Sequence, residues 1–127
     1  MTKVSLKVLK NAVRQSWSKE TSSDEFWESS NPSRGQCGPT SLVVQDYYRG
    51  SLRFGLIGYD DIIYGTHIWN VLLDGRALDL TRNQYPCSLP EKCFLGTAIS
   101  REEVLRVAGK KYKILKNSTE KLISGRK

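Results

Sequence analysis

Histidine, cysteine and long apolar runs are all scarce in this sequence, and each shortage excludes a class of protein. Only one histidine, His67, occurs among the 127 residues. Metal sites built from two or three imidazoles, such as the H-E-x-x-H motif, are therefore excluded. Any chemistry that needs an imidazole must use His67.

No apolar run is longer than four residues, far below the roughly 20 that a membrane-spanning helix needs. The start of the chain places lysines among apolar residues and does not form the apolar core of a signal peptide. We therefore expect a cytoplasmic protein that does not span a membrane. Periplasmic or cell-wall substrates are the least supported.

The sequence contains three cysteines: Cys37, Cys87 and Cys93. Because the number is odd and no export signal is evident, a disulfide framework is not expected. One alternative interpretation is a structural zinc site formed by the three cysteines with His67. The five residues between Cys87 and Cys93 exceed the usual ligand spacing of about two to four, so our main interpretation includes no metal.

The length of 127 residues predicts a single domain over residues 1–127, because compact domains commonly have about 100–150 residues. The chain is too short for a complete TIM barrel, a protein kinase, or a Rossmann domain with a second substrate domain. Its composition, 39% apolar and 26% charged, is that of an ordinary globular domain.

The net charge of +7 is concentrated at the C-terminal end. From Arg101 onward there are nine Lys or Arg residues and three Glu residues, whereas the first hundred residues are nearly neutral. A second alternative is therefore a non-catalytic binding module that holds a partner or polyanion through a basic C-terminal helix. Only one aromatic residue, Tyr112, lies among the lysines, so nucleic acid is not an expected partner.

Apolar spacing and capping residues predict four helices. A helix over 4–17 is indicated by apolar residues that recur every three or four positions: Leu6, Leu9, Val13 and Trp17. A second helix is predicted to begin at Cys37 or just after it and to end at Gly50, because Pro39 is favoured in a first helical turn. Ser100 opens a capping box for a third helix, which Gly109 is expected to close, and a fourth is predicted over 112–123.

The segments between the helices are predicted as loops and strands. Residues 20–36 are loop-like, with one helical turn around 24–27. Strands are predicted over 52–57, 67–72 and 77–80, and residues 62–64 either extend the first strand or join the connecting loop. Residues 82–99 predict an ordered loop with short extended pieces. The order of helix, helix, antiparallel strands and helix predicts an α+β domain.

A thiol, an imidazole and a carboxylate are the parts of a Cys-His-Asp nucleophilic site, and Cys37, His67 and Asp79 occur in that order. Cys37 lies at a predicted helix N-terminus, where the helix dipole and free N–H groups favour a thiolate. The adjacent Gly35 and Gly38 allow a substrate backbone to approach closely. These features favour a reactive cysteine over a buried structural one.

The Asp74-Gly75 pair predicts a hairpin whose loop length decides whether His67 and Asp79 can meet. A two-residue turn would pair His67 with Arg82 and place Asp79 on the opposite face. A three-residue loop over 73–75 would instead make His67 the diagonal neighbour of Asp79 on the same face. The Cys-His-Asp interpretation therefore predicts the three-residue loop.

Four segments resemble the YunG-like family of small bacterial and phage proteins: 31–37 (Asn-Pro-Ser-Arg-Gly-Gln-Cys), 42–46 (Leu-Val-Val-Gln-Asp), 67–70 (His-Ile-Trp-Asn) and 79–85 (Asp-Leu-Thr-Arg-Asn-Gln-Tyr). The resemblance covers about residues 10–120, and its motifs are specific when taken together. That family is similar to the papain-like and transglutaminase-like cysteine enzymes. The resemblance implies a papain-like core, with a nucleophile helix packed on a small antiparallel sheet that bears His and Asp.

Carried onto this chain, the resemblance implies that Cys37 is the nucleophile and His67 the general base and then acid. Asp79 would orient the imidazole and stabilise its charged form. The Cys37 backbone N–H and one side-chain amide, from Asn31 or Gln36, would stabilise the oxyanion.

Three further side chains are candidates for contact with substrate. Trp69 alternates with His67 on one strand, and Arg34 and Arg82 could receive an acidic group or a C-terminal carboxylate. The expected function is a hydrolase or acyltransferase acting on an amide, isopeptide or thioester bond of a peptide or protein acyl donor. No cofactor is implied, and hydrolysis and transfer would use the same triad.

Overall fold

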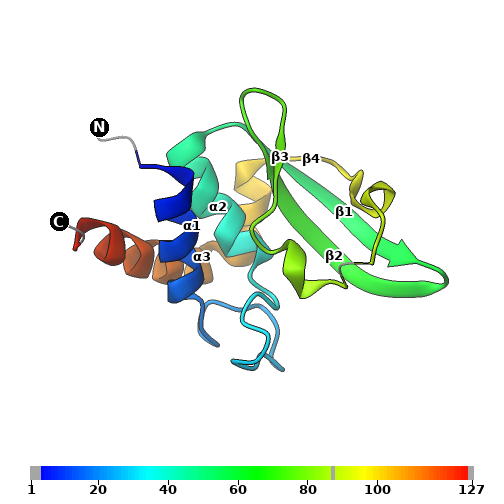
Figure 1. The fold of residues 1–127 in the computed structure, drawn as a ribbon, viewed down its shortest axis with the longest axis horizontal. Coiled ribbons are helices and arrows are strands. Elements are labelled where there is room, and N and C mark those ends of the chain that lie inside the picture. The colour runs from blue at the N-terminus through cyan, green and yellow to red at the C-terminus, as the bar shows by residue number, and fades with distance from the viewer. Residues whose placement is uncertain (1–3, 87, 126–127) are drawn as a thin grey trace.

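The computed structural model describes residues 4–86 and 88–125, which form an α+β fold with one antiparallel sheet. Its elements follow in this order: α1 (Leu6–Ser16), α2 (Cys37–Tyr48), β1 (Ser51–Tyr59), β2 (Ile62–Val71), β3 (Ala77–Leu78), the 3-10 helices η1 (Arg82–Gln84) and η2 (Glu91–Phe94), β4 (Thr97–Ile99) and α3 (Arg101–Ser124). The strand order is β3-β2-β1-β4. The three helices lie together at one end, and the β1–β2 hairpin extends away from them (Figure 1).

The main core lies between the helices and the near half of the sheet. Ser5 caps α1 through its Oγ, which accepts a hydrogen bond from the Val8 N–H at 3.2 Å. The helix predicted over 4–17 is confirmed but is shorter than predicted, because the backbone at Trp17 is already extended. Buried residues from the helices and the first two strands form this core: Leu9, Val13, Trp17, Leu42, Val43, Leu52, Ile68, Val104, Ala108, Tyr112 and Leu115.

α2 is the central helix, and it begins at Cys37 as the sequence predicts. Residues 38–44 are all buried, since α2 packs against both α3 and the sheet. Burial on all sides explains why this segment shows no amphipathic periodicity. The helix ends at Tyr48, before the predicted Gly50, because Arg49 and Gly50 both adopt positive φ (61° and 78°) and turn the chain into β1.

α3 is one continuous helix, so the two separate helices predicted over 100–109 and 112–123 are wrong. It starts after Ser100, whose Oγ accepts a hydrogen bond from the Glu103 N–H at 3.2 Å. The helix continues through Gly109 because its buried side is unbroken: Val104, Ala108, Tyr112, Leu115 and Thr119. Packing of that side against α1 and α2 outweighs the cost of about 1 kcal/mol for a glycine in a helix interior. Across residues 4–86 and 88–125, no helix is long and apolar enough to cross a membrane.

The hairpin loop after β2 has the predicted three-residue form. The Leu72 N–H donates to the Arg76 carbonyl at 2.8 Å, and Gly75 adopts a φ of 89°. Asn70 pairs with Leu78 and Val71 with Ala77, so the same register places position 69 opposite 79. The strand predicted over 77–80 is shorter than expected, because it ends at Leu78 and the chain turns away at Asp79.

The β1–β2 hairpin is longer than predicted, and residues 62–64 belong to its second strand. A tight turn at Asp60 and Asp61, both with positive φ, joins the two strands. The helical turn predicted around 24–27 is a hydrogen-bonded turn rather than a helix, with the Trp27 N–H donating to the Asp24 carbonyl at 3.1 Å.

The segment after β3 forms a second, smaller core against the sheet. Ile57, Tyr85 and Leu89 are buried there, and Cys93 and Phe94 pack against them. Because side chains alternate along a strand, His67 and Trp69 of β2 face this segment, whereas Ile68 belongs to the main core. The imidazole is therefore enclosed between the sheet and the segment that follows Asp79.

Candidate active site

Cys37 is the first residue of α2, so its backbone N–H has no intrahelical partner. The preceding residue, Gln36, makes no side-chain cap. Its amide is held elsewhere, because Oε1 accepts from the Thr21 hydroxyl at 2.8 Å and Nε2 donates to the Ser18 carbonyl at 3.0 Å. The helix N-terminus at Cys37 is consequently left free to stabilise a negative charge.

His67 and Asp79 form a short hydrogen bond. Nε2 of His67 lies 2.6 Å from Oδ2 of Asp79, so Nε2 carries a proton that it donates to the carboxylate. The other carboxylate oxygen accepts from both the backbone N–H and the hydroxyl of Thr81, at 3.2 and 3.3 Å. The turn at Thr81 thus fixes the carboxylate, and the carboxylate fixes the orientation of the imidazole.

Aromatic rings enclose the fully buried imidazole. Trp69 stacks on it at a centroid distance of 5.5 Å, and Tyr85 and Phe94 approach edge-on at 5.0 and 5.9 Å. Gly96 permits the stack, since a Cβ there would lie 2.5 Å from the Trp69 ring. The rings restrict the imidazole to one plane, in which Nε2 faces Asp79.

The pKa of His67 reflects two opposed influences. Burial, the largest, lowers it, but hydrogen bonds to Asp79 and Cys37 and the charges of those two groups outweigh burial and raise the pKa from 6.5 to about 9. Because Nε2 is bound to Asp79, Nδ1 is the ring nitrogen that remains for an interaction with Cys37. Burial also raises the pKa of Tyr85, with smaller contributions from the charges of Cys37 and Asp79. At neutral pH the imidazole therefore keeps a proton on both ring nitrogens.

This shift predicts a pH-dependent stability. In the unfolded chain the imidazole loses its proton near pH 6.5, whereas the folded protein keeps it until about pH 9. The stabilisation is therefore complete below pH 6.5 and is lost as the pH rises through 9, with a slope of at most about 1.4 kcal/mol per pH unit. Urea unfolding between pH 6 and 10 should show this decline in the wild-type protein and lose it in His67→Gln. An equal slope in both proteins would contradict the assignment.

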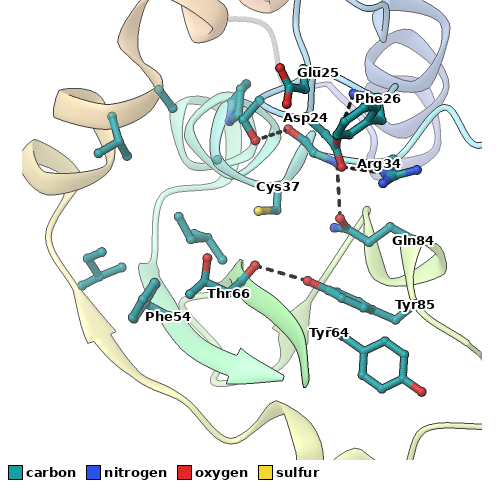
Figure 2. Close-up of a pocket in the computed structure, with 18 of the residues that line it drawn as sticks. Asp24, Glu25, Phe26, Arg34, Cys37, Phe54, Tyr64, Thr66, Gln84 and Tyr85 are labelled. Atoms are coloured by element: carbon teal, nitrogen blue, oxygen red, sulfur yellow. Dashed lines mark hydrogen bonds and ion pairs between the residues drawn. The ribbon is translucent and has the colours of Figure 1, made fainter. Parts of the chain in front are cut away.

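Cys37 lines a cavity of about 1090 Å³ that lies between the loop before α2, the sheet and the start of α3. Figure 2 shows the thiol between the 24–34 loop on one side and Thr66 and Tyr85 on the other. One part of the wall is apolar: Pro39, Phe54, Ile68, Ile99 and Val107. Another part is polar: Asp24, Glu25, Asn31, Arg34 and Gln84. A substrate in this cavity would reach the sulfur directly and the buried imidazole only past Cys37, Gln84 and Tyr85.

The two candidate oxyanion donors lie in different surroundings. Gln36 is fully buried and both ends of its amide are bound by residues of the 18–21 turn, so it cannot donate to a substrate. Asn31 lines the cavity, and its Oδ1 accepts a hydrogen bond from the Ser33 hydroxyl at 3.4 Å.

The three candidate substrate contacts also differ in position. Arg34 lines the cavity and donates to the Asp24 carboxylate at 2.6 Å. Trp69 is 4% exposed and contacts His67, so it supports the imidazole. Arg82 donates to the Leu89 carbonyl at 2.9 Å and lies over the Phe94 ring, so it holds the segment that covers His67. Neither Trp69 nor Arg82 is among the described residues that line the cavity.

Gln84 is the site residue to which the sequence analysis assigned no role. Its Oε1 accepts from the Gly35 N–H at 3.3 Å, and its Nε2 lies 3.4 Å from Nδ1 of His67. The only sequence signal was its place in the 79–85 segment of the resemblance, because no spacing rule brings η1 against a residue 49 positions earlier.

The structure describes part of what each of the two alternatives to catalysis needs, the zinc site and the basic C-terminal binding helix. Cys87, required by the zinc hypothesis, lies outside the described residues, and within those residues no group of three or more metal-ligating side chains occurs. The basic face of α3 exposes Arg106, Lys110 and Lys113, but Tyr112 is buried and donates a hydrogen bond to Asp46 at 2.6 Å. The aromatic residue among these lysines is thus engaged within the fold.

The residues of the candidate site all lie in the part of the chain that matches a protein family. Residues 5–124 match the family model described as YunG protein. The chain belongs to the YunG family. One YunG relative, an uncharacterized protein of Bacillus subtilis (strain 168), is 32% identical over 108 residues, which are 79% of this chain and 87% of the relative. No solved structure matches the chain. The predicted YunG-like membership is confirmed, and these matches do not extend to papain-like enzymes.

Proposed function

We propose that this YunG-family protein is a cysteine-nucleophile hydrolase or acyltransferase that acts on an amide, isopeptide or thioester bond. The observation that carries the proposal is a His67 imidazole that is hydrogen-bonded to Asp79 at 2.6 Å and has its pKa raised in part by Cys37, whose thiol lines a cavity of about 1090 Å³. A nucleophile, a base and an orienting group within hydrogen-bond reach are the signature of covalent catalysis.

Each step of the reaction has a residue to perform it. The Cys37 sulfur attacks the carbonyl carbon, and the helix N-terminus stabilises the negative charge that develops on the oxygen. The imidazolium donates its Nδ1 proton to the leaving group, which departs and leaves an acyl-Cys37. The neutral imidazole then takes a proton from water or an amine as that molecule attacks the acyl carbon. The attack releases the acyl group from Cys37. Asp79 holds Nε2–H throughout and stabilises the charged ring.

The arrangement also supports a relation to papain-like and transglutaminase-like enzymes, which we include in the proposal. The nucleophile begins a central helix, and the imidazole comes from an antiparallel strand packed beside it. We propose a peptide or protein as the acyl donor and the cytoplasm as the site of action. No step requires a cofactor.

p-Nitrophenyl acetate tests the proposal without knowledge of the natural substrate. The wild-type protein should release a burst of nitrophenolate equivalent to its own concentration and carry an acetyl group on Cys37, identified by peptide mass. Cys37→Ala should abolish the burst. Cys93→Ala is the matched control and should keep it, because Cys93 is a half-buried thiol of the second core that is not among the described residues lining the cavity.

Acetylation of Cys37 no faster than that of Cys93 in the wild-type protein would overturn the proposal. If the burst occurs, competition between water and an added primary amine for the acetyl group separates hydrolysis from transfer. A panel of amide, isopeptide and thioester substrates then identifies the bond that is cleaved.

A further inference from the structure

The carboxamide of Gln84 has a fixed orientation beside the nucleophile. A backbone N–H can only donate, so the amide oxygen must face Gly35, 3.3 Å away. The NH₂ group then faces Nδ1 of His67 at 3.4 Å. The Gln84 side chain and Cys37 line the same cavity (Figure 2). A donor is therefore presented in the cavity that Cys37 also lines.

Acyl transfer needs such a donor. When the sulfur attacks, negative charge develops on the carbonyl oxygen, and a single hydrogen-bond donor removed from such a site typically costs about 10²–10³-fold in rate. The Cys37 N–H at the start of α2 supplies one donor. A second must come from a side chain that lines the cavity.

The other amides near Cys37 are less suited. Gln36 is fully buried, with both ends of its amide bound to Thr21 and Ser18. Asn31 lines the cavity, but its described hydrogen bond is to Ser33, within its own loop. Gln84 is the amide that is both exposed to the cavity and hydrogen-bonded to the backbone two residues before the nucleophile.

We propose that Gln84 Nε2–H is the side-chain donor of the oxyanion site and hence a catalytic residue, an inference that rests on the proposed acyl transfer. The sulfur lone pair forms the S–C bond, and the π electrons of the carbonyl move to the oxygen. The N–H groups of Gln84 and Cys37 donate hydrogen bonds to the resulting oxyanion. As the C=O bond re-forms, the bond to the leaving group breaks, and the leaving group takes its proton from Nδ1 of His67. Neither N–H proton is transferred.

The geometry of the free protein fits a donor that binds more tightly in the transition state than before it. In the imidazolium both ring nitrogens carry protons, so Nδ1 cannot accept from Gln84 Nε2, and the separation of 3.4 Å is a contact between two donors. No hydrogen bond to the imidazolium is therefore lost when the N–H turns to the oxyanion. An interaction that strengthens only in the transition state accelerates the chemical step.

Two reactions of the same sulfur test the role. Acetylation by p-nitrophenyl acetate passes through an oxyanion, whereas alkylation by iodoacetamide does not, and both need the thiolate. In Gln84→Met, which preserves side-chain length, acetylation of Cys37 should fall by roughly 100-fold relative to alkylation. Gln15→Met makes the same change at an exposed position of α1 outside this cavity, and this control should leave the ratio of the two rates unchanged. Asn31→Ala tests the other amide that lines the cavity.

Each other outcome identifies a different error. Equal loss of both reactions in Gln84→Met, or an altered pH profile of alkylation, would show that Gln84 only positions His67 or the Gly35 backbone. A change of the ratio in Asn31→Ala alone would assign the donor to Asn31. Failure of the wild-type protein to acetylate Cys37 would overturn the proposed function itself, and the role of Gln84 with it.

Discussion

His67→Ala is expected to lower steady-state hydrolysis of p-nitrophenyl acetate by about 1000-fold at neutral pH. Under the proposed mechanism the variant loses the imidazolium that favours a thiolate at Cys37, and an ordinary thiol is only a few per cent ionised at pH 7. The base that activates water against the acyl-enzyme would be lost as well, and general acid–base catalysis contributes about 10²–10⁴-fold. Nitrophenolate release, followed beyond the burst, measures the combined effect.

The two contributions can be separated on the cysteine itself. Iodoacetamide alkylation, mapped by peptide mass against pH, reports only the thiolate. In the wild-type protein Cys37 should react well below the pH at which Cys93 does, and His67→Ala should bring the two profiles together. His67→Gln repeats the test with less loss of volume in the buried aromatic enclosure. If Cys37 and Cys93 already share one profile in the wild-type protein, no thiolate–imidazolium pair exists.

Gly35→Ala is expected to destabilise the fold by roughly 2–4 kcal/mol. Gly35 has a φ of 71°, a conformation that costs a non-glycine residue about 1–2 kcal/mol. A Cβ there would also lie 2.4 Å from the Ser22 hydroxyl and 2.7 Å from the Asp24 backbone nitrogen. Because Ser22 and Asp24 belong to the loop that walls the cavity, the clash would displace that loop and the backbone leading to Cys37. Urea unfolding measures the loss.

Gly75→Ala is the matched control for the strained backbone. Its φ of 89° is similar, but nothing lies within 4 Å of the added Cβ. The control should lose only about 1–2 kcal/mol, so the difference between the two variants measures the steric clash at the site. Equal losses of stability in the two variants would show that Ser22 and Asp24 make room for the added Cβ at Gly35 without an energetic cost. The acetylation burst should survive in Gly75→Ala and weaken in Gly35→Ala.

Local patterns in the sequence determined the secondary structure around the site and the register of one hairpin. Apolar spacing located α1, the Ser100 capping box located the start of α3, and the position of Pro39 indicated that a helix begins at or next to Cys37. The Asp74-Gly75 pair, with the requirement that His67 and Asp79 share a face, predicted the three-residue loop that the structure contains. These features succeed because short-range sterics and hydrogen bonding decide them.

Packing between distant segments decided what local patterns could not. Gly109 predicts a helix end by its conformational freedom, yet α3 passes through it because its buried side continues against two other helices. Burial of long polar side chains is equally non-local. Gln36, beside Cys37 in sequence, turns into the 18–21 loop, and Arg82 turns onto the carbonyls of its own segment.

The same distinction applies to the candidate active site. The sequence by itself determined the residue types and their order: one imidazole, a cysteine at a helix N-terminus, and an aspartate across a hairpin. Only the tertiary structure placed Gln84 beside Cys37 and His67, through a hydrogen bond to a backbone N–H 49 residues earlier. Contacts of that separation depend on how the helices close over the sheet, because no local preference of the chain brings η1 and the start of α2 together.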